Sequence, residues 1–345
     1  MNSMNTGTSE QRALRPADKM DSAHENSSGV APWAVSIYSS RETWPELQAT
    51  LTHAEVAARG RTSVLDLVIN GNKALAELAA RHVDSDLLEP QGRQLACRKR
   101  VWFVTLGDKA HAWNQYVTDI APPAKTYFFV DGYARVDAQS FACIDATLAM
   151  APQALAASGI PRSGWSARSL AARLRREGGL HGNLYALGAP AMQELRGLGF
   201  RLPLGLYRTD STLGAALAFG LNLHERAWRP HDRIALSEQA SWSITSLRWW
   251  SPQDWRTNLR RVARQGQGAL ENAAVREHFA IRGEPFHTLP ATALALVAAW
   301  MRGSPSAAAE LLAKNAAARR AWAQLQVPRD WNAASKPPQL LVDSH

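Results

Sequence analysis

The strongest indication of the fold comes from Thr126–Asp137, which reads TYFFVDGYARVD. Its apolar run ends abruptly at an acid, Asp131, which is followed by Gly132 and Tyr133. A short apolar run that stops at a polar turn is typical of a buried β-strand. The carboxylate then lies at the carboxyl end of the strand, where parallel sheets bind their ligands. From the local sequence alone, an N-cap or loop role for Asp131 is the alternative.

Three further apolar segments have the same character: WAVSIYS at 33–39, TSVLDLVIN at 62–70 and RVWFVTL at 100–106. Helical patterns separate them, over 42–60 and 73–82, and another helix is expected to open at Asp137. Strands that are apolar throughout and alternate with helices indicate a mostly parallel sheet covered on both faces. The sequence therefore predicts an α/β fold with flanking helices.

The composition limits the class of protein and its partners. The chain has 345 residues, 46% of them hydrophobic, which is enough for one large core or two modest ones. A net charge of +9 indicates an anionic partner, either nucleic acid, an anionic membrane surface or a phosphorylated substrate. No zinc-finger, helix-turn-helix or RNP motif accompanies the arginines, so we expect no specific nucleic acid.

The first thirty residues, the two cysteines and the longest apolar run indicate the compartment in which the protein is found. Residues 1–30 are rich in Ser, Asn, Asp and Glu, and we expect a disordered tail without a secretory signal. Cys97 and Cys143 fit no disulfide or metal framework, which favours a reducing environment. The longest apolar run, from Leu289, is too short to span a bilayer and predicts a buried helix. We expect a cytoplasmic protein, with the inner face of the membrane as an alternative location.

Seven stretches in a fixed order carry a resemblance to a known family. They are AVSIYSSRE (34–42), VLDLVINGN (64–72), LGDKAHAWN (106–114), FFVDGYARV (128–136), LHGNLYALGAPAMQEL (180–195), RLPLGLYRTDSTLGAAL (201–217) and ASWSITSLRWWSPQDWRTNLRRVARQGQG (240–268). Together they resemble nucleotide-sugar glycosyltransferases of the GT-A fold, family 2, from about Trp33 to Gly268. Each motif is weak by itself, and their collinear order carries the resemblance.

The resemblance implies a Rossmann-like fold in which successive segments of the chain have different functions. Residues 31–136 would bind the nucleotide sugar, 137–278 would form the acceptor-binding and catalytic half of the same domain, and 279–345 would be a helical C-terminal extension. It also implies a catalytic base at Asp210 and a ligand for a metal and the sugar diphosphate at Asp131. The implied donor-binding residues are Ser36, Tyr38, Ser39, Glu42, Asn70, Asn72, Lys109, Asn114, Asp131, Tyr133, Arg261, Arg264 and Gln265, and the implied acceptor-binding residues are His181, Gly182 and Asn183.

Simpler roles remain open for several of these residues. Asp210 precedes an apolar helical pattern, so an N-cap role is about as well supported as catalysis. Lys109 could be a solvated charge, and Asn114 could satisfy buried backbone. His181 and Asn183 could be strand-end hydrogen bonders, and arginines on the helix near Gly268 could form a solvated face.

Two departures from the family pattern bear on the chemistry. The usual Asp-x-Asp pair is Asp131-Gly132-Tyr133 here, so one ligand for Mg²⁺ or Mn²⁺ is missing and we expect weak metal dependence. Thr209 stands where the family often has Glu. A literal Asp-x-Asp at residues 84–86 falls in a predicted connecting loop, and we interpret it as unrelated to the site.

The resemblance implies an inverting glycosyltransferase of the hexosyltransferase type. Its acceptor would be a hydroxyl group of a glycolipid or glycan, as in polysaccharide biosynthesis, and the basic surface would suit peripheral contact with an anionic membrane. One alternative is a GT-A-like binding protein that has lost turnover together with its second acid. The other is a basic nucleic-acid-binding protein.

Overall fold

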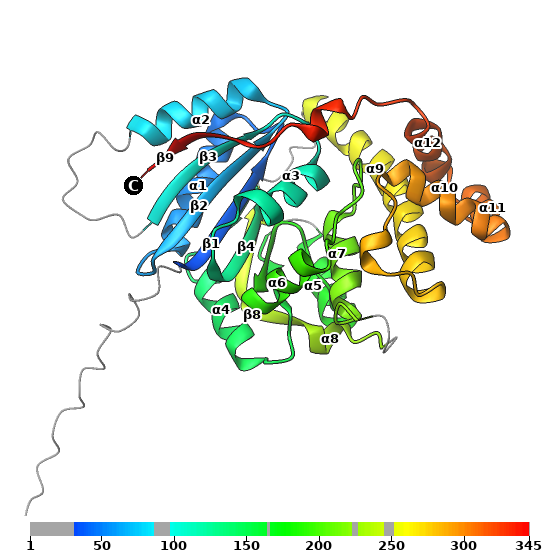
Figure 1. Ribbon diagram of the computed structural model, residues 1–345, viewed down its shortest axis with the longest axis horizontal. Coiled ribbons are helices and arrows are strands. Elements are labelled where there is room, and N and C mark those ends of the chain that lie inside the picture. The colour runs from blue at the N-terminus through cyan, green and yellow to red at the C-terminus, as the bar shows by residue number, and fades with distance from the viewer. Residues whose placement is uncertain (1–30, 86–96, 164–165, 223–226, 245–251, 345) are drawn as a thin grey trace, which may run out of the picture. The chain divides into compact units, whose positions relative to one another are not determined.

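The computed structural model describes residues 31–85, 97–163, 166–222, 227–244 and 252–344, with only the backbone for 252–263. Its centre is a nine-stranded sheet in the order β5-β8-β6-β7-β4-β1-β2-β3-β9 (Figure 1). Four adjacent strands run parallel, and they are β1 (Ala31–Ser39), β2 (Ser63–Asn70), β3 (Cys97–Val104) and β4 (Ala124–Asp131). All four strands predicted from apolar runs are thus observed.

The other half of the sheet is mixed in direction. Its strands are β5 (Ala134–Val136), β6 (Ala156–Pro161), β7 (Leu184–Gly188) and β8 (Ile234–Ile244). β7 runs antiparallel to both β4 and β6, whereas β8 runs parallel to β6 and pairs with β5 in the antiparallel direction. The sheet as a whole is mostly parallel, as predicted.

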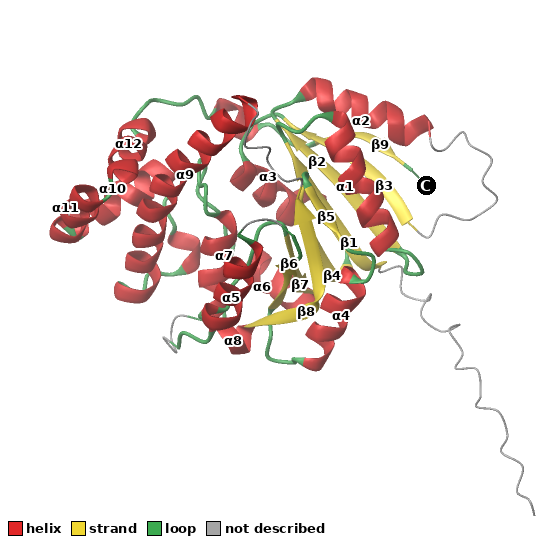
Figure 2. Cartoon of the chain, turned by 180° about the vertical axis from the view of Figure 1, so that it is seen from behind, coloured by secondary structure: helices red, strands yellow, loops and turns green. Residues whose placement is uncertain are grey.

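Helices cover both faces of the sheet (Figure 2). One face is packed by α1 (Trp44–Ala57), α2 (Lys73–Ser85) and α4 (Ser140–Met150). The other is packed by α3 (Lys109–Gln115), the π-helical turn η1 (Tyr116–Ile120) and α6 (Ala189–Gly197). Side chains of β1 enter the two cores alternately, because successive residues of a strand point to opposite faces. This confirms the predicted α/β class.

The remaining helices follow the sheet strands or form the C-terminal extension. They are α5 (Ala167–Glu177), α7 (Thr209–Ala218), α8 (Pro230–Arg233), α9 (Pro252–Arg276), α10 (Ala293–Gly303), α11 (Pro305–Lys314) and α12 (Ala316–Leu325), with short turns η2 (Glu277–Ile281), η3 (Phe286–Thr288) and η4 (Asn332–Ser335). The apolar run after Leu289 is the buried helix α10, as predicted. None of the described helices is long and apolar enough to cross a membrane.

Three local features differ from the predictions. The extension does not end in a helix, because β9 (Gln339–Asp343) returns to the sheet and pairs antiparallel with β3. The helix expected to open at Asp137 begins at Ser140, and the side chain of Asp137 instead pairs with Arg162 at 2.8 Å. α2 runs on to Ser85, so Asp84 is helical and Asp86 lies outside the described residues.

Candidate active site

The end of β4 is locked against the end of β1 by Gly132. Its N–H donates to the carbonyl of Tyr38 at 2.7 Å, and its carbonyl accepts from the Thr50 hydroxyl at 2.8 Å. A methyl group built on Gly132 would lie 2.7 Å from the Tyr38 oxygen, so this close approach requires glycine. Asp131, immediately before it, is thereby fixed at the carboxyl end of β4 with its side chain mostly buried.

Asp131 is held between a cation and a hydroxyl. Lys109, the first residue of α3, donates its ammonium to Oδ1, and the Tyr133 hydroxyl donates to Oδ2 at 3.0 Å. Burial by itself would lower the pKa of Lys109, but the neighbouring carboxylates, Asp131 foremost, raise it above its usual value. The charge of Asp131 also raises the pKa of Tyr133 well above its usual range. Both groups therefore keep their protons at neutral pH and act as hydrogen-bond donors.

Asp210 reaches the same place from the other half of the chain. It lies in the first turn of α7, whose N-cap is Arg208, and its Oδ2 accepts from the Gly182 N–H at 3.1 Å. A methyl group on Gly182 would lie 3.3 Å from Lys109 Nζ, 3.5 Å from Asp131 Oδ2 and 3.8 Å from Asp210 Cγ. The N-cap alternative for Asp210 is therefore wrong, and three groups from distant stretches converge at Gly182.

His181 forms one side of this cluster. Its ring stacks on Trp242 with centroids 4.7 Å apart, and its Nδ1 accepts from the Asn183 N–H at 3.2 Å. Burial lowers the pKa of His181 despite two carboxylates nearby, so the ring is neutral at pH 7. Because Nδ1 accepts a hydrogen bond, Nε2 carries the hydrogen of the neutral ring and is the donor.

A cationic and aromatic group borders the cluster next to Tyr133. Arg208 and Arg264 lie over the Tyr207 ring at 5.4 Å and 5.6 Å from its centroid. Tyr207 is close enough to Tyr133 to contribute to the raised pKa of that phenol. Tyr207 and Arg208 were not among the residues predicted for the site, although both directly precede Thr209 and Asp210 in the stretch that carries the resemblance.

Four predicted donor residues build the turns at the strand ends. Glu42 accepts from the Ser39 hydroxyl at 2.7 Å and from two backbone N–H groups, which closes the turn after β1. Asn72 caps α2 by accepting from the Leu75 N–H at 3.1 Å. In the amide orientation that satisfies both of its ends, Asn70 donates to Ser39 and accepts from the backbone of the turn after β3, each at 3.0 Å. These residues fix the polar turns at the carboxyl ends of β1 and β2.

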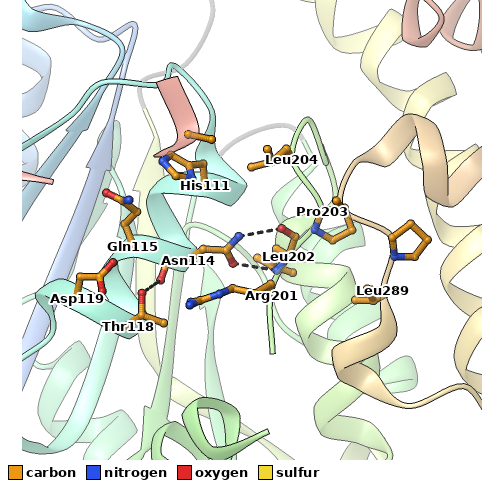
Figure 3. Close-up of a pocket in the computed structure, with 13 residues that line it drawn as sticks. His111, Asn114, Gln115, Thr118, Asp119, Arg201, Leu202, Pro203, Leu204 and Leu289 are labelled. Atoms are coloured by element: carbon orange, nitrogen blue, oxygen red, sulfur yellow. Dashed lines mark hydrogen bonds between the residues drawn. The ribbon is translucent and has the colours of Figure 1, made fainter. Parts of the chain in front are cut away.

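Three others do not join the cluster. Ser36 is fully buried inside β1 and donates to the Phe128 carbonyl at 3.1 Å. The Tyr38 ring stacks on Phe129 in the core, with centroids 6.4 Å apart. Asn114 uses both ends of its amide on the backbone of Leu202, at 2.9 Å and 2.8 Å, and lines a separate cavity of about 330 Å³ (Figure 3). The predicted alternative for Asn114, satisfying buried backbone, matches this contact.

The remaining predicted residues lie at the margin. Asn183 is buried beside His181, and its backbone N–H is the donor described above. Gln265 is exposed on α9, one residue after Arg264. The side chain of Arg261 lies outside the described residues.

The donor set at Asp131 does not fit a divalent metal ion. Both carboxylate oxygens already have partners, and one of these partners is the Lys109 ammonium. Mg²⁺ and Mn²⁺ prefer several oxygen ligands, whereas in the described part of the chain no three His, Cys, Asp or Glu side chains are grouped to hold an ion. A lysine charge thus occupies the position for which the resemblance implies a metal.

No protein-family model matches the sequence, and no curated protein matches it. Among solved structures, the mannosyltransferase PcManGT from Pyrobaculum calidifontis in complex with GDP-Man and Mn²⁺ is similar, with 19% identity, a TM-score of 0.49, and 87% of this chain and 85% of that chain covered. TarS 1–349 from S. aureus in complex with UDP-GlcNAc has 9% identity, a TM-score of 0.43, and 85% and 90% covered. GalNAc-T7 with UDP, GalNAc and Mn²⁺ has 11% identity, a TM-score of 0.40, and 79% and 55% covered.

Proposed function

We propose that this chain is a GT-A-type glycosyltransferase that moves a sugar from a nucleotide-diphosphate sugar to a hydroxyl acceptor with inversion. The observation that carries the proposal is the convergence of Lys109, Asp131 and Asp210 around Gly182 at the carboxyl end of β4. Glycosyl transfer needs a base for the acceptor and fixed positive charge for the departing diphosphate. This cluster contains both.

Asp210 is the base in this proposal. Its Oδ2 is held by the Gly182 N–H, which leaves Oδ1 to accept the proton of the acceptor hydroxyl. The acceptor oxygen then forms a bond to the anomeric carbon while the bond from that carbon to the diphosphate oxygen breaks. A single displacement of this kind inverts the configuration at the anomeric carbon.

The departing diphosphate takes up negative charge that this chain meets with lysine and arginine. Lys109 stays protonated because neighbouring carboxylates raise its pKa. Arg264 lies over the ring of Tyr207, which is near Tyr133. Cations that are already held in place stabilise such charge without reorganising. A metal ion that enters with the donor would add to this charge, and no ready-made site for one lies among the residues that the structure describes.

The finer assignments, to glycosyltransferase family 2 and to hexosyl transfer, rest on the resemblance of seven collinear stretches. We propose a glycolipid or glycan acceptor, as in polysaccharide biosynthesis at the cytoplasmic face of a membrane. The net charge of +9 supports peripheral contact with an anionic bilayer. Vesicles with and without anionic lipid, compared by sedimentation at low and physiological salt, test that contact directly.

Ligand-induced thermal stabilisation tests the donor class. We expect at least one of a panel of UDP-, GDP- and dTDP-sugars to raise the melting temperature of the wild-type protein. The Asp131→Asn variant should lose most of that shift, whereas Glu238→Gln, which changes a surface carboxylate paired with Arg175, should keep it. Stabilisation by none of the donors, together with tight salt-sensitive DNA binding, contradicts the proposal and favours a nucleic-acid-binding protein.

A donor-binding protein without turnover is the second candidate. The observation that favours it is Tyr133, which stands in place of a second acid. Release of nucleoside diphosphate from the stabilising donor, measured with an acceptor mixture and with water alone, separates the two. Donor binding without release under any of these conditions supports the binding protein.

A further inference from the structure

A buried carboxylate outside the cluster contacts the backbone that leads to Asp210. Glu271 lies on α9 and has no exposed surface. Its carboxylate accepts from the Tyr207 N–H at 2.9 Å and 3.1 Å and from the Arg208 N–H at 2.8 Å. The two amides belong to the residues immediately before α7, so Glu271 is connected to Asp210 through two peptide units.

A second α9 side chain supports the same segment. Gln267, one helical turn before Glu271, donates to the Gly205 carbonyl at 2.9 Å and to Glu271 at 2.7 Å. Residues 205–208 lie between α6 and α7 and belong to neither helix, so their backbone groups need partners from elsewhere. α9 supplies partners for the Gly205 carbonyl and for the Tyr207 and Arg208 N–H groups, from residues that lie side by side on one face of the helix. The Gly205 N–H instead donates to Asp108 at 3.0 Å.

The chemistry of the contact requires an acceptor-only group. Two backbone N–H groups and one amide N–H point at the Glu271 oxygens. An ionised carboxylate can accept all of them, whereas a glutamine would turn an NH₂ group toward at least one donor. Burying a charge is costly, and a buried apolar residue would pack here at lower cost if packing were the only requirement.

We infer that Glu271 is a positioning residue that holds the start of α7 so that Asp210 meets both Gly182 and the acceptor. In this role Glu271 acts through the backbone of Tyr207 and Arg208 and not directly on the substrate. The inference rests on the proposed function, because it assigns Glu271 a role in the transfer step that Asp210 performs.

Amide hydrogen exchange tests the contact between Glu271 and the backbone before α7 without a measurement of sugar transfer. In Glu271→Gln, we expect the Tyr207 and Arg208 amides to exchange at least about tenfold faster than in the wild type, which is the effect of losing one good hydrogen bond. Glu277→Gln is the matched control, because Glu277 is a mostly buried carboxylate just after α9 that pairs with Arg282 at 3.3 Å. Unchanged exchange at both amides in Glu271→Gln overturns the inference.

A double-mutant cycle tests the role in transfer. Glu271→Gln should lower kcat by up to about a hundredfold, the cost of a misplacement of about 1 Å, with the KM for the donor nearly unchanged. In the Asp210→Asn background, the same change should lower kcat by less than about twofold further, because its effect passes through Asp210. Wild-type kcat in Glu271→Gln, or an equal loss in both backgrounds, overturns the inference. If the wild type transfers no sugar at all, the proposed function fails while the exchange experiment still decides whether Glu271 holds the segment.

Discussion

Ionisation of Glu271 gives the folded protein a pH dependence that can be measured. Burial raises the pKa of this carboxyl from its ordinary 4.5 to about 7, although the backbone N–H groups of Tyr207 and Arg208, Gln267 and the Arg208 charge offset part of the effect. At about 1.4 kcal/mol per pKa unit, this difference corresponds to about 3 kcal/mol. The folded state binds the proton more tightly than the unfolded state, so the stabilisation is complete below pH 4.5 and is lost as the pH rises to about 7.

Urea unfolding of the wild type and of Glu271→Gln at pH 5, 6, 7 and 8 isolates this contribution. The variant has no group that titrates at this position, so the other titrating groups largely cancel in the difference. We expect the wild type to lose about 2.5 kcal/mol relative to Glu271→Gln between pH 5 and 8. Equal m-values for the two proteins at each pH are the internal control, because they show that the unfolding reaction is the same.

If the free energies of unfolding of the two proteins differed by the same amount at every pH, this expectation would be wrong, because Glu271 would then not be an acid with a strongly raised pKa. We also expect the stability of the fold and the rate of transfer to change in opposite directions with pH. Transfer should decrease as the pH falls below 7, where Glu271 takes up a proton and loses acceptor capacity, while the same protonation stabilises the fold.

Three further predictions concern the cluster itself. Asp210→Asn can still accept from the Gly182 N–H, so folding and donor affinity should be kept while kcat falls by about a hundred- to ten-thousandfold; comparable turnover at equal stability would exclude Asp210 as the base. Lys109→Met should weaken donor binding by about ten- to a hundredfold, because charged hydrogen bonds contribute about 1.5–3 kcal/mol. EDTA should change the donor affinity of the wild type little. Loss of donor binding in EDTA with recovery in Mn²⁺ would show that Asp131 does ligate a metal. Gly132→Ala should lower the free energy of unfolding by about 1–3 kcal/mol in thermal melts, because its methyl group meets the β1 backbone at 2.7 Å; a wild-type melting temperature would contradict that contact.

The sheet and one end of the site could be predicted from local pattern. The apolar runs 33–39 and 126–130 are observed as parts of β1 and β4, because strands covered on both faces need apolar side chains throughout. The polar residue that ends such a run lies at the end of the strand, and Asp131 is the last residue of β4 as predicted. The position of Asp210 at the start of a helix was also predictable, since an apolar helical pattern follows it.

The partners of these residues could not be predicted, because they depend on contacts between distant parts of the chain. Asn114 bonds to Leu202, 88 residues away, and this contact takes it out of the cluster to which its motif assigns it. Lys109 pairs with Asp131 only because α3 begins at the same edge of the sheet where β4 ends. β9 lacks a long apolar run of its own and is specified by pairing with β3 and by the Arg98–Asp343 ion pair.

The role of α9 also depends on contacts that its sequence pattern does not show. In sequence, Arg264, Gln267 and Glu271 are polar residues on a basic helix, which is ordinarily a solvated face. In the structure, this face meets the stretch before Asp210, with Arg264 over the Tyr207 ring and Glu271 on its backbone N–H. The helix therefore supplies a cation to the proposed donor site and a buried acceptor to the segment that carries the proposed base. Because one helix contacts both, its placement affects the distance between the departing diphosphate and the base. A substitution in the packing of α9 should therefore change the rate of transfer by shifting these groups, even where the substituted residue contacts neither substrate.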